Sequence, residues 1–253
     1  MNKRMWKMVG MIFLLFNCQF LFAQAPVNYT HFTYWSRLTV SKLYAKKWEF
    51  AAEYQHRRQT YREDDLNLMQ APLLHSFRVR ARYTVSDALT FAVIPFTYFY
   101  ASPLLGNERD YMRKPDKEYR FAGQAEFRQK IGKTEVLNRY GYESRFIKRP
   151  PDSLFRYIGR IRVRLLLEHP FFSKTDKKET FRPYASGEVF LNTGAAVEPT
   201  RIFEHTRLMT GIRFPISAFL RVDAGYQYAF RVRRTGFEKD HEHTLFTYFV
   251  FQL

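Results

Sequence analysis

The feature that most constrains this chain is a regular alternation of side-chain character along long segments. Near the C-terminus, Leu220, Val222 and Ala224 alternate with Arg221 and Asp223, and the pattern continues to residue 233. Successive residues of a β-strand point to opposite faces, so a period of two predicts strands with one apolar face and one charged face. The same alternation recurs at 77–85, 118–128 and 156–165.

The length of these segments and the turns between them favour a membrane barrel. A soluble antiparallel sheet with one wet face gives the same alternation, but soluble strands average about 5 or 6 residues, and membrane-crossing strands need about 9 to 11. Short turns at 86–87, 132–133 and 215–216 alternate with longer polar stretches, an arrangement typical of outer-membrane barrels. The longer stretches are 60–70, 102–117, 149–153, 193–201 and 234–240.

Two segments depart from this pattern. Residues 174–180 form a longer turn on the short-turn side. Residues 88–100 are apolar on both faces and contain Pro95, which cannot donate a ladder hydrogen bond, so we expect a bend or an edge defect there.

The number of strands conflicts with a general rule. Single-chain bacterial barrels have even numbers of strands, but eleven segments qualify here. Either Thr33–Ser41 is not a full barrel strand, which leaves ten, or one strand is missing, which gives twelve. We therefore expect an all-β, antiparallel up-and-down transmembrane β-barrel of about 10–12 strands. The segments are 31–41, 46–58, 74–86, 88–100, 118–131, 133–147, 155–168, 181–192, 202–214, 217–233 and 241–253.

Composition is consistent with such a barrel and argues against other classes of protein. The 253 residues include 41 Lys and Arg against 24 Asp and Glu, which first suggests a nucleic-acid binder. However, Phe and Tyr recur along the whole length, and a hydrophobic share of 46% excludes a disordered basic tail. A spanning helix needs roughly 20 mostly apolar residues, which the chain after residue 23 does not contain.

The N-terminus predicts export. Lys3, Arg4 and Lys7 precede an apolar run at 8–16, and Ala23 precedes Gln24. This pattern predicts a cleaved signal peptide at 1–23 and a single barrel domain at 24–253, and a short membrane anchor is the alternative. Cleavage would remove Cys18 and leave no cysteine for a disulfide. Export to the cell outer membrane also argues against a nucleic-acid partner.

Several strand patterns resemble those of the domain of unknown function 2490 family. The patterns are the first hairpin around Trp35 with Glu53, Gln55 and Arg57, then Asn138–Arg145, Glu188–Asn192, Gly225–Tyr226 and 243–253. The family is similar to bacterial outer-membrane β-barrels, is common in Bacteroidetes and has no established activity. The resemblance covers residues 30–253, implies fold and location, and transfers no catalytic residue.

The last strand also indicates how the barrel is assembled. Leu245, Thr247, Phe249, Phe251 and Leu253 share one face up to the final residue. This strand resembles the C-terminal strand by which outer-membrane proteins are recognised, although Leu253 replaces the usual terminal aromatic residue. We expect the barrel-insertion machinery to be a partner during assembly, and outer-membrane lipid and lipopolysaccharide to surround the folded protein.

If the apolar and aromatic face meets lipid, the charged face must line the lumen. Arginine and carboxylate ladders could fill that lumen and make it rigid. Alternatively, the arginine excess could favour a small anionic solute in a narrow pore. The predicted lumen network is Arg78, Arg80, Arg82, Arg120, Glu126, Arg128, Arg139, Glu143, Arg145, Arg160, Arg162, Arg164, Glu188, Arg207, Arg213, Arg221, Asp223 and Arg231, with Glu49, Glu53, Glu118 and Glu168 on the same faces.

A third hypothesis is an enzyme at the barrel rim that modifies lipid A or other lipids. Glu204-His205 and His241-Glu242-His243 lie near predicted outer strand ends, and Ser153 lies in an outer loop. His241 and His243 share a face and could be a metal pair or merely polar rim residues. The sequence has no phosphate-cradling glycine loop, paired cysteine ligands or nucleophile elbow, so we expect no cofactor.

Overall fold

A computed structural model describes residues 27–61, 67–173, 175, 178–195, 197–198, 201–233 and 236–253. The predicted signal peptide lies outside these residues. The strands are β1 (Val27–Tyr44), β2 (Trp48–Gln59), β3 (Ala71–Ser86), β4 (Leu89–Ala101), β5 (Asp116–Ile131), β6 (Thr134–Lys148), β7 (Arg156–Glu168), β8 (Phe171–Phe172), β9 (Glu179–Thr193), β10 (Phe203–Pro215), β11 (Leu220–Val232) and β12 (Glu238–Gln252). The helix α2 (Glu108–Met112) lies between β4 and β5, and no helix in the described ranges could span a bilayer.

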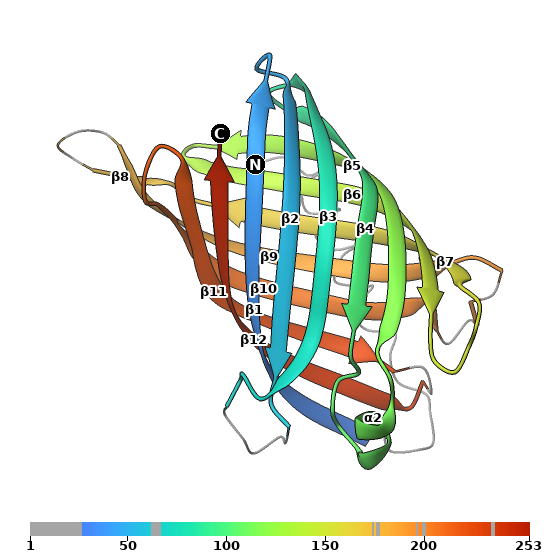
Figure 1. Cartoon of the computed structure of the whole chain (residues 1–253). Helices are drawn as coiled ribbons and strands as arrows, with labels where there is room; N and C mark the ends of the chain where they lie inside the picture. The colour runs from blue at the N-terminus through green and yellow to red at the C-terminus, as the bar shows by residue number, and fades with distance from the viewer. Residues whose placement is uncertain are drawn as a thin grey trace, which may run out of the picture.

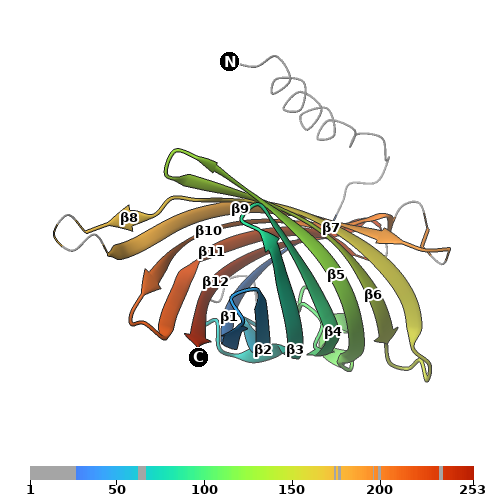
Figure 2. The same cartoon turned by 90° about the horizontal axis from the view of Figure 1, so that it is seen from above.

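Eleven of these strands form a closed barrel. Strands β1 to β7 and β9 to β12 each pair antiparallel with the next, and β7 pairs directly with β9. The ring closes where β1 and β12 run side by side in parallel, from Val27 opposite Glu238 to Ser41 opposite Gln252 (Figure 1). The two-residue strand β8 pairs with β9 and projects away from the barrel wall (Figure 2).

The parallel pair resolves the conflict over strand number. All eleven predicted strands are present, and the prediction of ten or twelve is wrong, as is the expectation that every pair is antiparallel. Thr33–Ser41 belongs to a full strand that pairs on both edges. When neighbours alternate in direction, the first and last strands of an odd set point the same way. They can therefore close the ring only in parallel.

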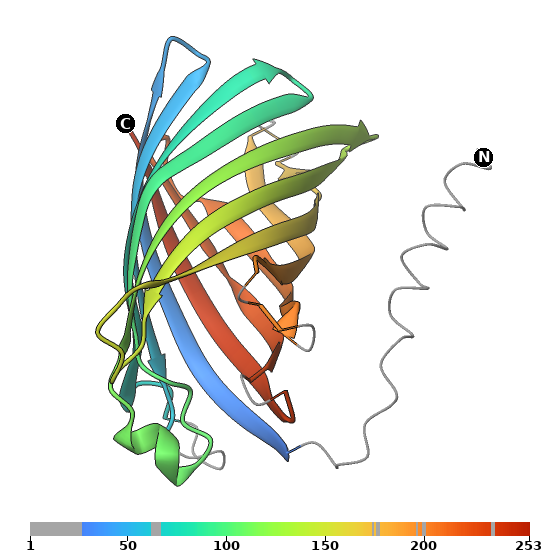
Figure 3. The same cartoon turned by 90° about the vertical axis from the view of Figure 1, so that its right-hand side faces the viewer.

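The two ends of the barrel differ, as the turn pattern predicts. One end, here called the short-turn end, carries the turns at 45–47, 87–88, 132–133 and 216–219. The opposite, long-loop end carries the wider connections, including α2 (Figure 3). The predicted irregularity near Pro95 is also present, because the β4–β5 register shifts between Ile94 and Thr97.

The two faces of the wall carry the two kinds of side chain that the alternation separates. On β4, the outward Phe91 is 48% exposed while the inward Ala92 is 2% exposed. Apolar and aromatic residues cover the outside on strand after strand, and carboxylates such as Glu126 and Glu143 are buried inside. A contiguous apolar surface of this extent is unusual for a soluble protein.

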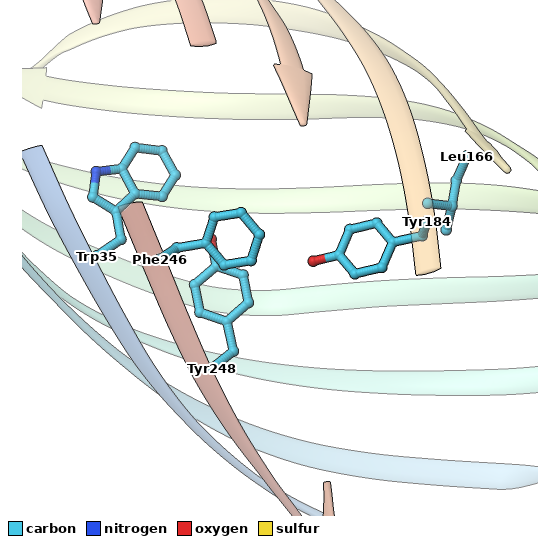
Figure 4. Packing of buried hydrophobic residues seen from close by; sticks show 5 residues of the cluster. All are labelled: Trp35, Leu166, Tyr184, Phe246 and Tyr248. Carbon is cyan, nitrogen blue, oxygen red and sulfur yellow. The ribbon is translucent and has the colours of Figure 1, made fainter. Parts of the chain in front are cut away.

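The apolar core lies inside the lumen. Trp35, Leu166, Tyr184, Phe246 and Tyr248 form a buried cluster that joins β1 and β12 to β7 and β9, with Leu137 and Met209 packed against it. Phe246 and Tyr184 point toward each other from β12 and β9 (Figure 4). We call this cluster the aromatic layer.

Two paired glycines make room for the aromatic layer. Gly211 and Gly225 lie opposite each other in the β10–β11 register. A Cβ at Gly225 would lie 2.7 Å from Phe246 Cζ, and one at Gly211 would lie 2.8 Å from the Tyr184 hydroxyl. The two rings therefore occupy the space that side chains at these positions would fill.

Replacing Gly225 with alanine should destabilise the barrel. Overpacking a filled interior typically costs about 1–3 kcal/mol, so the folded band in detergent electrophoresis should convert to the unfolded band at a lower temperature. Gly123→Ala is the matched control, since a Cβ there meets nothing within 4 Å. Equal conversion temperatures for the two variants would contradict this account of the glycine pair.

Candidate functional site

Below the aromatic layer, toward the short-turn end, ion pairs fill the lumen. Arg80 bridges Glu49 and Glu53 at 3.1 and 3.0 Å. Glu126 accepts from Arg82 at 2.6 Å and from Arg139 at 2.8 Å. A second group links Asp223, Arg213, Glu168, Arg182, Glu179, Glu135 and Arg128. These pairs join neighbouring strands and make the lower half of the barrel rigid.

Above the layer, acids and arginines alternate along an unbroken chain in the wall. Its members in order are Glu118, Arg145, Glu204, Arg160, Glu143, Arg162, Glu188 and Arg207. Arg145 lies 2.6 Å from Glu118 and 2.8 Å from Glu204. Most of these arginines are held between two carboxylates, which neutralise them and fix their planes.

A bulge puts Glu204 into this chain. The β9–β10 register shifts between Phe203 and His205, so the adjacent residues Glu204 and His205 both face the lumen. Glu204 lies 2.7 Å from Arg160 on β7, beyond the neighbouring strand β9. The His205 ring stacks on Phe190 with 3.7 Å between centroids. Strict alternation would place one of these two residues outside.

A chamber of about 470 Å³ opens from the long-loop half of the lumen. Among the described residues, thirteen arginines and seven carboxylates line it. The lining reaches down to Arg162, Phe190 and Arg207, and it includes none of the short-turn ion pairs around Glu49 or Glu126. The aromatic layer lies just below this depth, and none of its five buried residues lines the chamber.

Three arginines at the chamber floor lack the close pairing seen in the wall. Arg207 is 3.5 Å from Glu188 and Arg231 is 3.7 Å from Glu242. Arg57 has no ion pair within the described part of the chain, and its guanidinium lies 3.3 Å from the Trp35 ring centroid. The Nε atoms of all three are buried without a hydrogen-bond partner there. We call Arg57, Arg207 and Arg231 the floor arginines.

The loop between β4 and β5, residues 102–115, covers part of the chamber mouth. Gln59 donates to the Pro103 carbonyl at 2.9 Å, and Leu104 packs on the cluster of Leu73, Leu74 and Phe99. On the other side, Arg233 reaches Asp110 at 2.8 Å and Asp240 at 2.7 Å. This loop therefore connects the β4–β5 edge to β11 and β12 across the opening.

The Arg233 pairs stay charged despite partial burial. Burial disfavours the charged guanidinium, but Asp240 and Asp110 outweigh it and raise the pKa of Arg233 above its ordinary value. Asp110 also accepts from the Gly106 and Asn107 backbone N–H groups, as part of the capping box of α2. The buried carboxylate of Asp110 thus both caps α2 and pairs with Arg233.

All eighteen residues of the predicted lumen network lie on the charged side of the wall. Among the described residues, every one except Arg164 forms an ion pair, and Arg164 donates to Ser186 instead. The predicted lumen network did not include Trp35, Arg37 and Arg57. Arg57 shares a face of β2 with Glu53 and Gln55, and Trp35 shares a face of β1 with Arg37. The alternation placed Arg233 on the charged face with Arg231, although Arg233 was not included in the lumen network, and it could not place Glu204 inward, because a bulge turns that residue.

The residues of the enzyme hypothesis do not come together. His241 and His243 lie on the outer face, where they bond the hydroxyls of Tyr228 and Tyr226 at 2.7 and 2.6 Å. Glu204 and His205 lie inside the chamber, and Glu204 is neutralised by two arginines. Ser153 has no contact with any of these residues in the described segments, which also hold no group of three or more potential metal ligands.

A family model described as "Protein of unknown function (DUF2490)" matches residues 32–240. The chain belongs to this family. The match includes most of the chamber wall, with Arg57, Phe190 and Arg207. A search of curated proteins finds no match to this chain.

Solved barrels are similar in outline and distant in sequence. A structure titled "NanC porin" shares 11% identity, with 83% of this chain and 92% of that chain covered and a TM-score of 0.48. A bacterial polysaccharide outer membrane secretin also shares 11% identity, at a TM-score of 0.47. The alignment covers 80% of this chain and 63% of the secretin chain. For the β domain of the Bordetella autotransporter BrkA the TM-score is 0.41. No residue role carries over at this similarity.

Replacing Asp110 with asparagine should loosen the loop over the chamber mouth. The change removes the charge that pairs with Arg233, and breaking a buried pair is strongly destabilising. Trypsin should cut after the exposed Arg109 or Arg113 about tenfold faster, because local opening governs such cleavage. Glu108→Gln, an exposed change on the same helix, should leave the rate unchanged. Equal rates in the two variants would show that Arg233 does not hold the loop.

Proposed function

We propose that this protein is an outer-membrane β-barrel that takes small anions into a chamber open at the long-loop end. The observation that carries the proposal is the lining of that chamber, where arginines outnumber carboxylates and the floor arginines are incompletely paired. Arginine-lined constrictions favour anions in pores. The loops of the long-loop end would face the cell exterior, as longer loops do in outer-membrane barrels.

The outer surface supports the membrane part of the proposal. Phe121, Phe127, Val163 and Leu165 are among the many apolar side chains that are about half exposed on the outside of the wall. Burying such surface in hydrocarbon is favourable, and ring closure pairs both edges of the eleven wall strands that the structure describes. Charged side chains are concentrated on the opposite face, where they avoid lipid.

The aromatic layer argues against an open diffusion pore. Trp35 and Phe246 are each 2% exposed, and ion pairs fill the lumen beneath them. A solute that entered the chamber would have to displace this layer to cross the barrel. The geometry therefore favours binding at the outer end over free passage.

The membrane assignment predicts a simple outcome on fractionation. The protein should be recovered with the outer membrane, and boiling in detergent should slow its electrophoretic migration because a closed barrel resists detergent unfolding. Recovery as a soluble periplasmic protein without a heat-dependent shift would overturn the assignment.

Opening the aromatic layer should reveal the charge preference of the lumen. In planar bilayers the wild-type protein should show little steady conductance, whereas Trp35→Ala combined with Phe246→Ala should increase it. The reversal potential in a salt gradient should indicate anion preference, because the chamber arginines remain. Phe121→Ala, an aromatic truncation on the outer face, serves as the matched control.

Two results would contradict the proposal. The first is a wild-type barrel that passes uncharged sugars in liposome-swelling assays. The second is cation preference in the opened variant, since that would mean that carboxylates dominate the permeation path. Folding of each variant is checked by its heat-dependent migration.

A further inference from the structure

We infer that the chamber floor is a specific oxyanion site, built for a phosphate or carboxylate group by Arg57, Arg207 and Arg231. This inference rests on the proposed function and names the group that the chamber binds. A specific site can be distinguished from a generally positive lumen, because the three guanidinium groups line the same chamber and differ in pairing from Arg145, Arg160 and Arg162 in its wall.

The first argument is the contrast in pairing between wall and floor. Arg145 and Arg160 in the wall each contact two carboxylates at hydrogen-bond distance. At the floor, Arg207 and Arg231 have only long contacts of 3.5 and 3.7 Å, and Arg57 has no carboxylate within ion-pair distance among the described residues. Buried charges without a close partner are costly, so an anion at this position would satisfy them.

The second argument is unsatisfied donors. Arg57, Arg207 and Arg231 all line the same chamber, and the Nε atom of each is buried with no hydrogen-bond partner in the described structure. Buried polar groups are almost always hydrogen-bonded. Arg37, Arg80 and Arg82 also have a buried Nε without a partner, but only the three floor arginines among these six line the chamber, and guanidinium forks match carboxylate and phosphate geometry.

The third argument is preorganisation by two buried aromatic rings. Trp35 lies directly opposite Arg57 in the β1–β2 register, and its ring also lies 5.2 Å from the Arg207 guanidinium. Phe190 lies 5.0 Å from Arg207 on the other side. Cation–π contacts of this kind stabilise a desolvated guanidinium without neutralising it. The rings hold like charges together and leave the Nε donors without an acceptor in the described structure, while Arg57 Nη2 donates to the Gln55 side chain at 3.1 Å.

The test uses Trp35 as a reporter of the floor. Replacing Trp6 and Trp48 with phenylalanine leaves Trp35 as the single tryptophan in the full chain. Inorganic phosphate and acetate are titrated separately in detergent at constant ionic strength, with chloride exchanged for the probe. Trp35 emission should change saturably with at least one probe, and the stronger of the two identifies the group that the floor prefers.

Substitutions then separate a site from bulk charge. Arg57→Gln should weaken binding about tenfold or more, because it removes a charge-assisted hydrogen bond. Arg57→Lys should retain part of the affinity, since it keeps the charge and loses the fork. Arg164→Gln is the matched control, because Arg164 faces the lumen, has no ion pair in the part of the chain that the structure describes, and does not line the chamber. Arg231→Gln provides a second floor variant if Arg57→Gln does not fold.

Two outcomes would overturn the floor site. One is the absence of a saturable Trp35 response to both probes. The other is equal weakening by Arg164→Gln and Arg57→Gln, which would mean that the lumen acts only through its overall charge. In either case an anion-preferring opened variant would still support the proposed function, so the two proposals fail separately.

Discussion

Pairing of buried arginines with carboxylates is the interaction on which the rest of this structure depends. The alternation of the sequence puts apolar groups outside and charged groups inside a narrow ring. A guanidinium confined there is costly unless it is neutralised. The chains of ion pairs through Glu143, Glu126 and Glu168 solve this problem strand by strand. The pairs named here link neighbouring strands of the wall.

The same requirement explains why the chamber floor differs from the wall. Trp35 and Phe190 replace carboxylates as the neighbours of Arg57 and Arg207. An aromatic face stabilises a cation but does not neutralise it, so positive charge is preserved at one depth of the lumen. The aromatic layer then closes the lumen below. Charge retention and closure at one level are the structural basis for a binding chamber.

The sequence predicted a residue's position correctly where strict alternation along a strand decides which face its side chain occupies. Arg78, Arg160 and Arg213 face inward as the alternation predicts, and all eleven strands lie within a few residues of their predicted bounds. The prediction failed where a local irregularity, such as a bulge, interrupts the alternation. The bulge at Phe203 turns Glu204 inward, and the odd strand number was rejected although the segments themselves were counted correctly. Arg57 alternates in step with Glu53 and Gln55 along β2, so the same alternation predicts that it faces the lumen.

By itself, the sequence determined the fold class, the two faces of the wall and the positions of its turns. These follow from side-chain period and length, which are local properties of the chain. The tertiary structure decided the parallel closure, the partner of each arginine, and which arginines remain incompletely paired. Those depend on which strands meet across the lumen, and on contacts such as Arg233 with Asp110 that join residues more than a hundred positions apart. No local pattern contains that information, because it arises only when the ring closes.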